Sequence, residues 1–148
     1  MVRTIIKDEQ MLRQKSDKFE FTNVSDLTYN YGGDEYLIQD ILDTAEHHKE
    51  HCIGLAAIQM GIPKRLIAVK IRDTFVPMIN PAIIQKSKDT YTTMEGCLSL
   101  EGQREVRRHW SIKVAYTTKD KKAKVETFKG LVAEIIQHEV DHTNGILI

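Results

Sequence analysis

Apolar residues recur at the spacing of an α-helix in two segments of the chain. From residue 34 to about residue 50 they fall on one helical face, namely Leu37, Ile38, Ile41, Leu42 and Ala45. After Gly130 the same period continues through residue 142, carried by Leu131, Val132, Ile135 and Ile136. Acidic residues begin the first segment and histidines end it, an order that suits the helix dipole. A third, short helix is expected over residues 8–14.

Between the two long helices lie shorter apolar segments with the composition of β-strands. Residues 65–71 are rich in Leu, Ile and Val, and residues 75–79 form a second candidate. The dipeptide Asn80-Pro81 is expected to end that second strand, because proline removes a ladder donor. A further strand is expected to begin at Ile83-Ile84.

The strongest strand signal comes later in the chain. Residues 111–117 alternate apolar and polar side chains, which is typical of a half-buried strand. The lysine-rich residues 119–124 predict a charged hairpin turn before a last strand at 125–128, and residues 20–33 predict a loop. The order of helix, antiparallel strands and helix predicts an α+β fold, with the strands packed around the C-terminal helix.

Composition narrows the class of protein. A chain of 148 residues predicts a single domain spanning residues 1–148. The 21 basic and 21 acidic residues give zero net charge, which removes the main electrostatic argument for nucleic-acid or membrane-surface binding. No apolar run is long enough for a membrane helix. With two cysteines and no signal-peptide pattern, a reducing compartment is expected, which favours the cytoplasm.

Candidate chemistry lies in the last helix, in the sequence Gln137-His138-Glu139-Val140-Asp141-His142. His138 and His142 are four residues apart, so on a helix both imidazoles can bind one metal ion. Glu139 lies about 100 degrees around the helix from His138, where a carboxylate can take a proton from water. The alternative is an exposed helix that carries this pattern by chance.

A catalytic metal of this kind needs a third protein ligand and one open position. Position 148 holds Ile where a third His would follow in one known pattern, so the third ligand is expected upstream. Cys97, in Glu95-Gly96-Cys97-Leu98-Ser99, is the best candidate. A buried, apolar thiol is the alternative.

Two further features are less decisive by themselves. The segment 54–59, Gly-Leu-Ala-Ala-Ile-Gln, indicates a backbone that packs closely against something, or else a tight helix-to-loop junction. Glu95 and Arg108 are expected to pair, because a strand that follows the Glu-Gly-Cys turn can return the arginine beside the glutamate. Alternatively, Arg108 is exposed in a basic cluster with Arg107.

Taken together and in this order, residues 52–59, 95–99 and 137–142 resemble the motifs of the peptide deformylase family. That family carries G-x-G-hydrophobic-A-A-x-Q, E-G-C-hydrophobic-S and Q-H-E-x-x-D-H. The resemblance covers roughly residues 5–148 and includes the spacing between the motifs. It implies a metal-dependent hydrolase that removes the N-formyl group from the formyl-methionine of newly made polypeptides and releases formate.

Four departures from the family pattern stand out. Cys52 replaces the first motif glycine, Glu101 falls where proline often occurs, and Thr143 replaces a usual leucine. The chain also reads as a short member without a C-terminal extension. Cys52 is expected to narrow the peptide site, with packing in a small gap as the alternative.

The resemblance also implies roles for particular residues. Cys97, His138 and His142 would bind the metal, and Glu139 would be the general base. The oxyanion would be held by the metal, the side chain of Gln59 and the backbone N–H of Leu98.

Substrate contacts follow from the same resemblance. Gly54 would bind the peptide backbone, Ile135 and His138 would form the wall of the methionine pocket, and Arg104 would contact the peptide further along. The cofactor implied is one divalent metal, Fe(II) in the cell, with zinc, nickel or cobalt as alternatives that the ligand set accepts. The expected partners are formyl-methionyl peptides and nascent chains, with the ribosome as a further candidate.

Two other classes of function remain open on the sequence alone. One is a related metallohydrolase that acts on a different small amide or an unformylated peptide. The other is a metal-binding protein with little turnover, which the substitution at Cys52 would favour.

Overall fold

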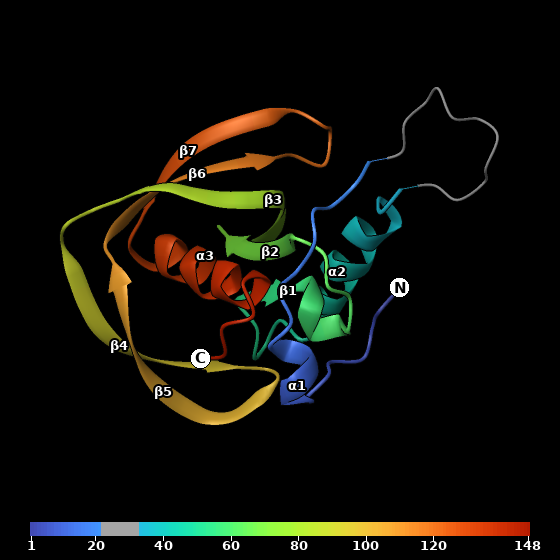
Figure 1. Ribbon diagram of the computed structural model, residues 1–148, viewed down its shortest axis with the longest axis horizontal. Helices are drawn as coiled ribbons and strands as arrows, with labels where there is room; N and C mark the ends of the chain where they lie inside the picture. Colours follow the sequence, from blue (N-terminus) through green and yellow to red (C-terminus); the bar gives the residue numbers. More distant parts are fainter. Residues whose placement is uncertain (22–32) are drawn as a thin grey trace.

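The computed structural model describes residues 1–21 and 33–148. Its elements follow one another as α1 (Glu9–Leu12), α2 (Tyr36–His47), β1 (Gly54–Ala56), the 3₁₀ helix η1 (Ala57–Met60), β2 (Leu66–Ile71), β3 (Thr74–Lys86), β4 (Thr90–Cys97), β5 (Leu100–His109), β6 (Ser111–Thr117), β7 (Ala123–Lys129) and α3 (Gly130–Thr143) (Figure 1). All three expected helices are present, and the α+β class with antiparallel strands is confirmed. The predicted loop over residues 20–33 lies mostly outside the described residues.

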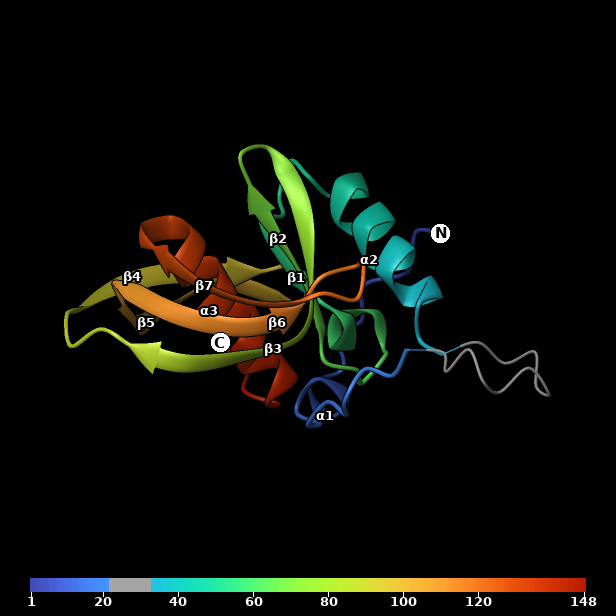
Figure 2. The same ribbon diagram turned by 90° about the horizontal axis from the view of Figure 1, so that it is seen from above.

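A five-stranded antiparallel sheet, in the order β1-β2-β3-β6-β7, forms the centre of the fold. Helices α2 and α3 lie on opposite sides of strands β1 to β3 (Figure 2). Alternate side chains of β2 pack on the two faces of the sheet, because successive residues of a strand point to opposite faces. Leu66 and Ala68 pack on the α2 side and Ile67 and Val69 on the α3 side, all of them fully buried.

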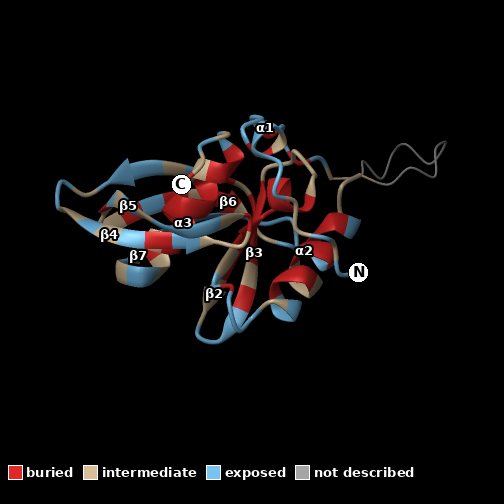
Figure 3. Ribbon diagram, turned by 90° about the horizontal axis from the view of Figure 1, so that it is seen from below, coloured by how far each residue is buried: buried red, intermediate tan, exposed pale blue. Residues whose placement is uncertain are grey.

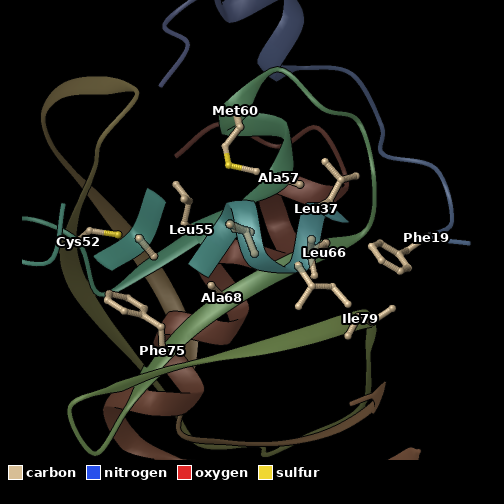
Figure 4. Close-up of a cluster of buried hydrophobic side chains, with 13 residues drawn as sticks. Phe19, Leu37, Cys52, Leu55, Ala57, Met60, Leu66, Ala68, Phe75 and Ile79 are labelled. Atoms are coloured by element: carbon tan, nitrogen blue, oxygen red, sulfur yellow. The ribbon is translucent and has the colours of Figure 1, made fainter. Parts of the chain in front are cut away.

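Two apolar clusters result from this arrangement, and they hold α2 and α3 against opposite faces of the sheet. The first joins α2 to the sheet through residues such as Leu37, Ile41 and Leu55 (Figure 4). The second joins α3 to the other face through residues such as Met78 and Ile136. Figure 3 shows that α3 is buried over most of its length, unlike a helix on the surface.

Strand β3 does not end at Asn80-Pro81, so that prediction is wrong. The strand continues to Lys86, and the segment expected to begin at Ile83 is its second half. The pairing with β6 is irregular between Ile79 and Ala82, and Asn80 has a positive φ of 51°. This irregularity lets the strand pass a proline, since the register shift removes the need for a donor at that position. The Asn80 side chain bonds to both backbone groups of Phe19, which holds the distorted strand against the first segment of the chain.

For the hairpin of β4 and β5, the sequence predicted only that a strand after the Glu-Gly-Cys turn returns Arg108 beside Glu95, and not the full length of the two strands. Its strands pair antiparallel from Thr90 opposite His109 to Cys97 opposite Leu100. Most of its side chains are exposed or half-buried, so neither strand shows the alternation of a half-buried strand. In Figure 1 this hairpin curves around the far side of α3 from β6 and β7. The hairpin is therefore the element that brings Cys97 to the last helix.

Candidate metal centre

Three potential metal ligands from two elements converge beside α3. His138 and His142 project from the helix one turn apart, and Cys97 comes from the end of β4. One ligand atom from each residue lies within 4.8 Å of the other two. The Nε2 atoms of the two imidazoles are 3.2 Å apart. Both histidines are buried, so the alternative of an exposed helix with a chance motif is wrong.

The charged and buried groups around these two histidines favour a positive charge at the position of the imidazoles. His138 uses Nδ1 to contact Glu95 Oε1 at 2.7 Å, which leaves its Nε2 directed at His142. Burial and the neighbouring His138 lower the pKa of His142 to about 3, so its imidazole is neutral. Burial lowers the pKa of His138 too, but Cys97, Glu139 and Glu95 together raise it to about 10. The surroundings therefore favour a positive charge at this point, and a thiolate with two imidazoles is a donor set for a divalent metal.

Glu139 lies beside this cluster with an unsatisfied carboxylate oxygen. Its side chain is 3% exposed, and Oε1 has no hydrogen-bond partner among the described residues. Burial raises the pKa of Glu139 to about 7, although His138 opposes the shift. A carboxylate with a pKa near neutrality can both accept and return a proton, which is what general acid–base catalysis requires.

An ion-pair network lies behind the histidine ligand, including the predicted contact between Glu95 and Arg108. Arg108 donates from Nε to Glu95 Oε2 at 3.0 Å and from Nη2 to Glu95 Oε1 at 2.6 Å. Arg108 is 5% exposed, so the alternative of an exposed basic cluster is wrong. Burial raises the pKa of Glu95, but the contacts with His138 and Arg108 outweigh burial and hold that pKa at about 2. Glu95 therefore presents a fixed negative charge to His138.

The network has a fourth member that the sequence analysis missed. Arg108 also donates from Nη1 to Asp141 Oδ2 at 2.6 Å. Asp141 lies three residues after His138 on α3, so Arg108 of β5 ties the hairpin to the helix beside this candidate ligand. The signal in the sequence was the aspartate inside the last motif, one residue before His142.

Gln59 reaches the turn between β4 and β5, which contains Leu98 and Ser99. Gln59 is 1% exposed, and its Nε2 donates to Ser99 Oγ at 3.3 Å. Its Oε1 accepts from the backbone N–H of Ala56 at 3.0 Å. This bond orients the amide so that its NH₂ group points to the turn. The segment 54–59 is thus strand β1 followed by η1, and the alternative of a helix-to-loop junction is wrong.

A pocket of about 240 Å³ opens onto Cys97 and His138, whereas the fully buried His142 does not line it. Gly54, Leu98, Ile135 and Glu139 line it together with Cys97 and His138. Arg104 does not line the pocket, whereas its neighbour Gln103 does, so a contact of Arg104 with substrate stays a prediction. Met94 and Glu134 also line the pocket and were not predicted.

Cys52 lies at the edge of this pocket but is mainly a core residue. It is 3% exposed, belongs to the apolar cluster beneath α2, and its thiol contacts the carbonyl of Gly54 at 3.2 Å (Figure 4). Burial, and then the charge of Glu139, raise the pKa of the thiol to about 12. These observations favour the packing alternative, and an effect of Cys52 on the width of the peptide site stays a prediction.

The fold and the H-E-x-x-H cluster together define a hydrolase of the α+β class. The family model described as polypeptide deformylase matches residues 2–148. A peptide deformylase of Clostridium beijerinckii is 41% identical over 148 residues, which is 100% of both chains. The chain therefore belongs to the peptide deformylase family. It removes the N-formyl group from nascent polypeptides, and the family depends on a metal ion.

Solved structures agree with this assignment. The peptide deformylase of Thermotoga maritima has a TM-score of 0.83 and 30% identity, covering 99% of this chain and 95% of that one. A class I type b enzyme of Acinetobacter baumannii with bound Met-Ala-Ser has a TM-score of 0.80 and 30% identity, covering 99% and 96%. Among the described residues, no helix is long and apolar enough to cross a membrane.

Proposed function

We propose that Cys97, His138 and His142 bind the catalytic metal ion, and that residues 1–148 act as one catalytic domain. The proposal is supported by the convergence of the three ligand atoms within 4.8 Å and by the facing Nε2 atoms of the histidines. The ion supplies Lewis acidity, which lowers the pKa of water and polarises a carbonyl group. Glu95, which is held by Arg108, contacts His138 Nδ1 and so orients the imidazole, whose other nitrogen would bind the ion.

Glu139 is the proposed general base, and the single observation that carries this role is its buried carboxylate, whose Oε1 has no hydrogen-bond partner among the described residues. Glu139 accepts a proton as water attacks the formyl carbon. It then returns the proton to the departing amine of the peptide, so that formate leaves. The attack places negative charge on the formyl oxygen, which accepts hydrogen bonds from Gln59 and from the backbone N–H of Leu98.

The peptide is proposed to lie along the pocket. Gly54 binds the peptide backbone, and Ile135 with His138 forms the wall for the methionine side chain. Arg104 contacts the peptide beyond the pocket. The missing side chain of Gly54 supports this placement, because a Cβ there would lie 2.6 Å from Glu139 Oε2.

The test of the site is the Glu139→Gln variant, prepared without oxygen. The amide cannot accept a proton, so formate release from formyl-Met-Ala-Ser should fall by about 10²–10⁴-fold while metal content stays at the parent value. Glu105→Gln, an exposed residue of β5, is the matched control. Turnover within a few fold of the parent would assign the base elsewhere.

Fe(II) is the proposed ion in the cell, with zinc, nickel and cobalt as replacements in purified protein. A thiolate beside Fe(II) is sensitive to oxidation, so protein purified anaerobically should contain iron and lose activity in air. Zinc as the sole metal in anaerobically purified, active protein would contradict the choice of iron. We place this activity in the cytoplasm, on nascent chains at the ribosome; cosedimentation with translating ribosomes tests that partner.

A further inference from the structure

Glu134 adds a carboxylate to the pocket that the deformylation chemistry does not use. It lies four residues before His138 on α3, so it shares the helix face of that ligand one turn away. The rise of a helix places the two Cα atoms about 6 Å apart along the axis. A substrate whose formyl group lies at the metal ligands therefore has its first side chain within reach of Glu134.

The position of this carboxylate is set by a second element. Tyr91 of β4 donates its hydroxyl hydrogen bond to Glu134 Oε1 at 2.8 Å. The bond uses one acceptor site of Glu134, whose carboxylate also interacts with that of Glu95. Each carboxylate oxygen has more than one acceptor site, so this pair of carboxylates can still accept from a cationic ligand. Glu134 is thus held at the wall of the pocket and not in the core.

The charges around the pocket leave Glu134 without a full counter-charge. Three carboxylates line the pocket, from Glu95, Glu134 and Glu139, and no lysine or arginine occurs among the described residues that line it. Arg108 forms an ion pair with Glu95 and balances its charge, and Glu139 is the proposed general base. Glu134, by contrast, has the neutral Tyr91 as its hydrogen-bond donor. Burial raises the pKa of Glu134 and the adjacent Glu95 adds to the rise, while Tyr91 and Arg108 oppose it. A cation bound here would relieve the repulsion between the two carboxylates.

The remaining walls near Glu134 are apolar. Met94 and Ile135 line the same pocket. A wall that is apolar along its length and negative at one point suits a side chain with an aliphatic stem and a cationic end. Lysine has such a side chain.

We propose that Glu134 is a specificity-determining residue, which lets this enzyme accept formyl peptides whose first residue carries a cationic side chain. The inference rests on the proposed metal site, because it needs the formyl group to lie at Cys97, His138 and His142. The apolar part of the same pocket still accepts methionine. The substrate class is therefore broader than formyl-methionyl peptides and includes those that begin with formyl-lysine.

The test compares two peptides that differ by one ammonium group. Formyl-Lys-Ala-Ser and formyl-norleucine-Ala-Ser have the same carbon chain in the first residue, so the ratio of their kcat/KM values isolates the charge. Glu134→Gln keeps the shape and an acceptor for Tyr91 but removes the charge. That ratio should fall about fivefold in Glu134→Gln, as expected for a partly exposed ion pair.

Two control variants separate charge from structure. Tyr91→Phe removes the hydrogen bond but keeps the charge, so the lysine-to-norleucine ratio should stay within twofold of the parent. Glu126→Gln alters another glutamate that accepts from a tyrosine, Tyr116, and that does not line the pocket. Its ratio should equal that of the parent. An equal ratio in Glu134→Gln and the parent, or the same fall in Glu126→Gln, would overturn the proposal.

A third peptide checks the assignment to the first residue. If Glu134→Gln changes the kcat/KM of formyl-norleucine-Lys-Ser instead, the cation binds at the second residue and the assignment is wrong. Failure of the underlying site is recognised separately. In that case Glu139→Gln would keep its activity on formyl-norleucine-Ala-Ser, whatever Glu134 does.

Discussion

Gly54 is the residue whose side chain would interfere most directly with the proposed base. A Cβ at this position would lie 2.6 Å from both Glu139 Oε2 and the Cγ2 atom of Ile135. Because the helix backbone around Glu139 is buried, the carboxylate has to move. We expect Gly54→Ala to lower kcat by about 10²-fold, the typical cost of displacing a reacting group by about 1 Å, with unchanged metal content.

Steady-state kinetics and metal analysis of one preparation check this prediction. The control is Gly102→Ala, where a Cβ meets no atom within 4 Å but φ is +75°. It should cost stability through backbone strain without the loss in kcat. A parent-like kcat in Gly54→Ala would show that Glu139 tolerates the displacement.

Glu95 is expected to act on the metal through His138 and not by direct contact. Its Oε1 accepts from His138 Nδ1 and from Arg108 Nη2. Glu95→Gln keeps an acceptor for the His138 imidazole but loses the negative charge that raises the basicity of that imidazole. We expect the metal affinity, measured by competition with a chelator, to fall about 10–100-fold.

The comparison variant for Glu95 is Glu105→Gln, because Glu105 lies exposed on β5 of the same hairpin. Its metal affinity should match the parent. Parent-like affinity in Glu95→Gln as well would mean that Arg108 and helix packing alone orient His138.

At the residue scale, the sequence predicted those site residues whose geometry a helix determines. His138 and His142 follow from the helical period, and Glu139 follows from its position between them. The proximity of Cys97 depends on how a hairpin folds back, which spacing alone does not determine. Ser99, which contacts Gln59, lies within the E-G-C-hydrophobic-S motif but was given no role. Glu134, which lines the pocket, was missed because it belongs to no recognised pattern.

At the scale of elements, the β4–β5 hairpin and α3 are joined by the side chain of Gln137. Its Oε1 accepts from the backbone N–H of His109 and its Nε2 donates to the carbonyl of the same residue, each at 2.9 Å. Gln137→Leu leaves two backbone groups of the hairpin end without partners. We expect the free energy of unfolding to fall by about 1–3 kcal/mol in urea denaturation.

Gln85→Leu on the exposed part of β3 is the control for Gln137→Leu, and it should change the free energy of unfolding by less than about 0.5 kcal/mol. If both variants unfold at the same urea concentration as the parent, the hairpin is held to α3 by its ion pairs alone. Arg108 is the residue to examine in that case.

The same hairpin explains where prediction of elements failed. Residues buried on one face give strands and helices a period, and β6 and α2 were predicted for that reason. The hairpin buries few side chains, and those include the charged Glu95 and Arg108, so it has no apolar period to recognise. Strand β3 was cut short in the prediction because a proline usually ends a strand, whereas here a bulge accommodates it.

At the scale of the whole molecule, the proposed metal ligands come from two parts of the fold that differ in how many side chains they bury. Helix α3 is packed in an apolar core with β2 and β3, whereas β4–β5 has few buried side chains. Cys97 belongs to the weakly packed part, and His138 and His142 belong to the strongly packed one. A metal ion bound to all three is therefore a cross-link between the hairpin and the core.

Removing the metal should thus destabilise the protein and loosen the hairpin first. A ligand that binds only the folded state stabilises it by about 4 kcal/mol when present at 1,000 times its dissociation constant. We expect chelation to lower Tm by several degrees in the parent. Amide exchange should become faster in β4 and β5 than in β6, because local opening is easier where few side chains are buried.

Cys97→Ser provides the matched control, since without its thiolate the Tm should hardly respond to chelator. An equal loss of exchange protection in β6 and in the hairpin would contradict this picture, because the metal would then stabilise the fold as one unit and not as a link between two parts.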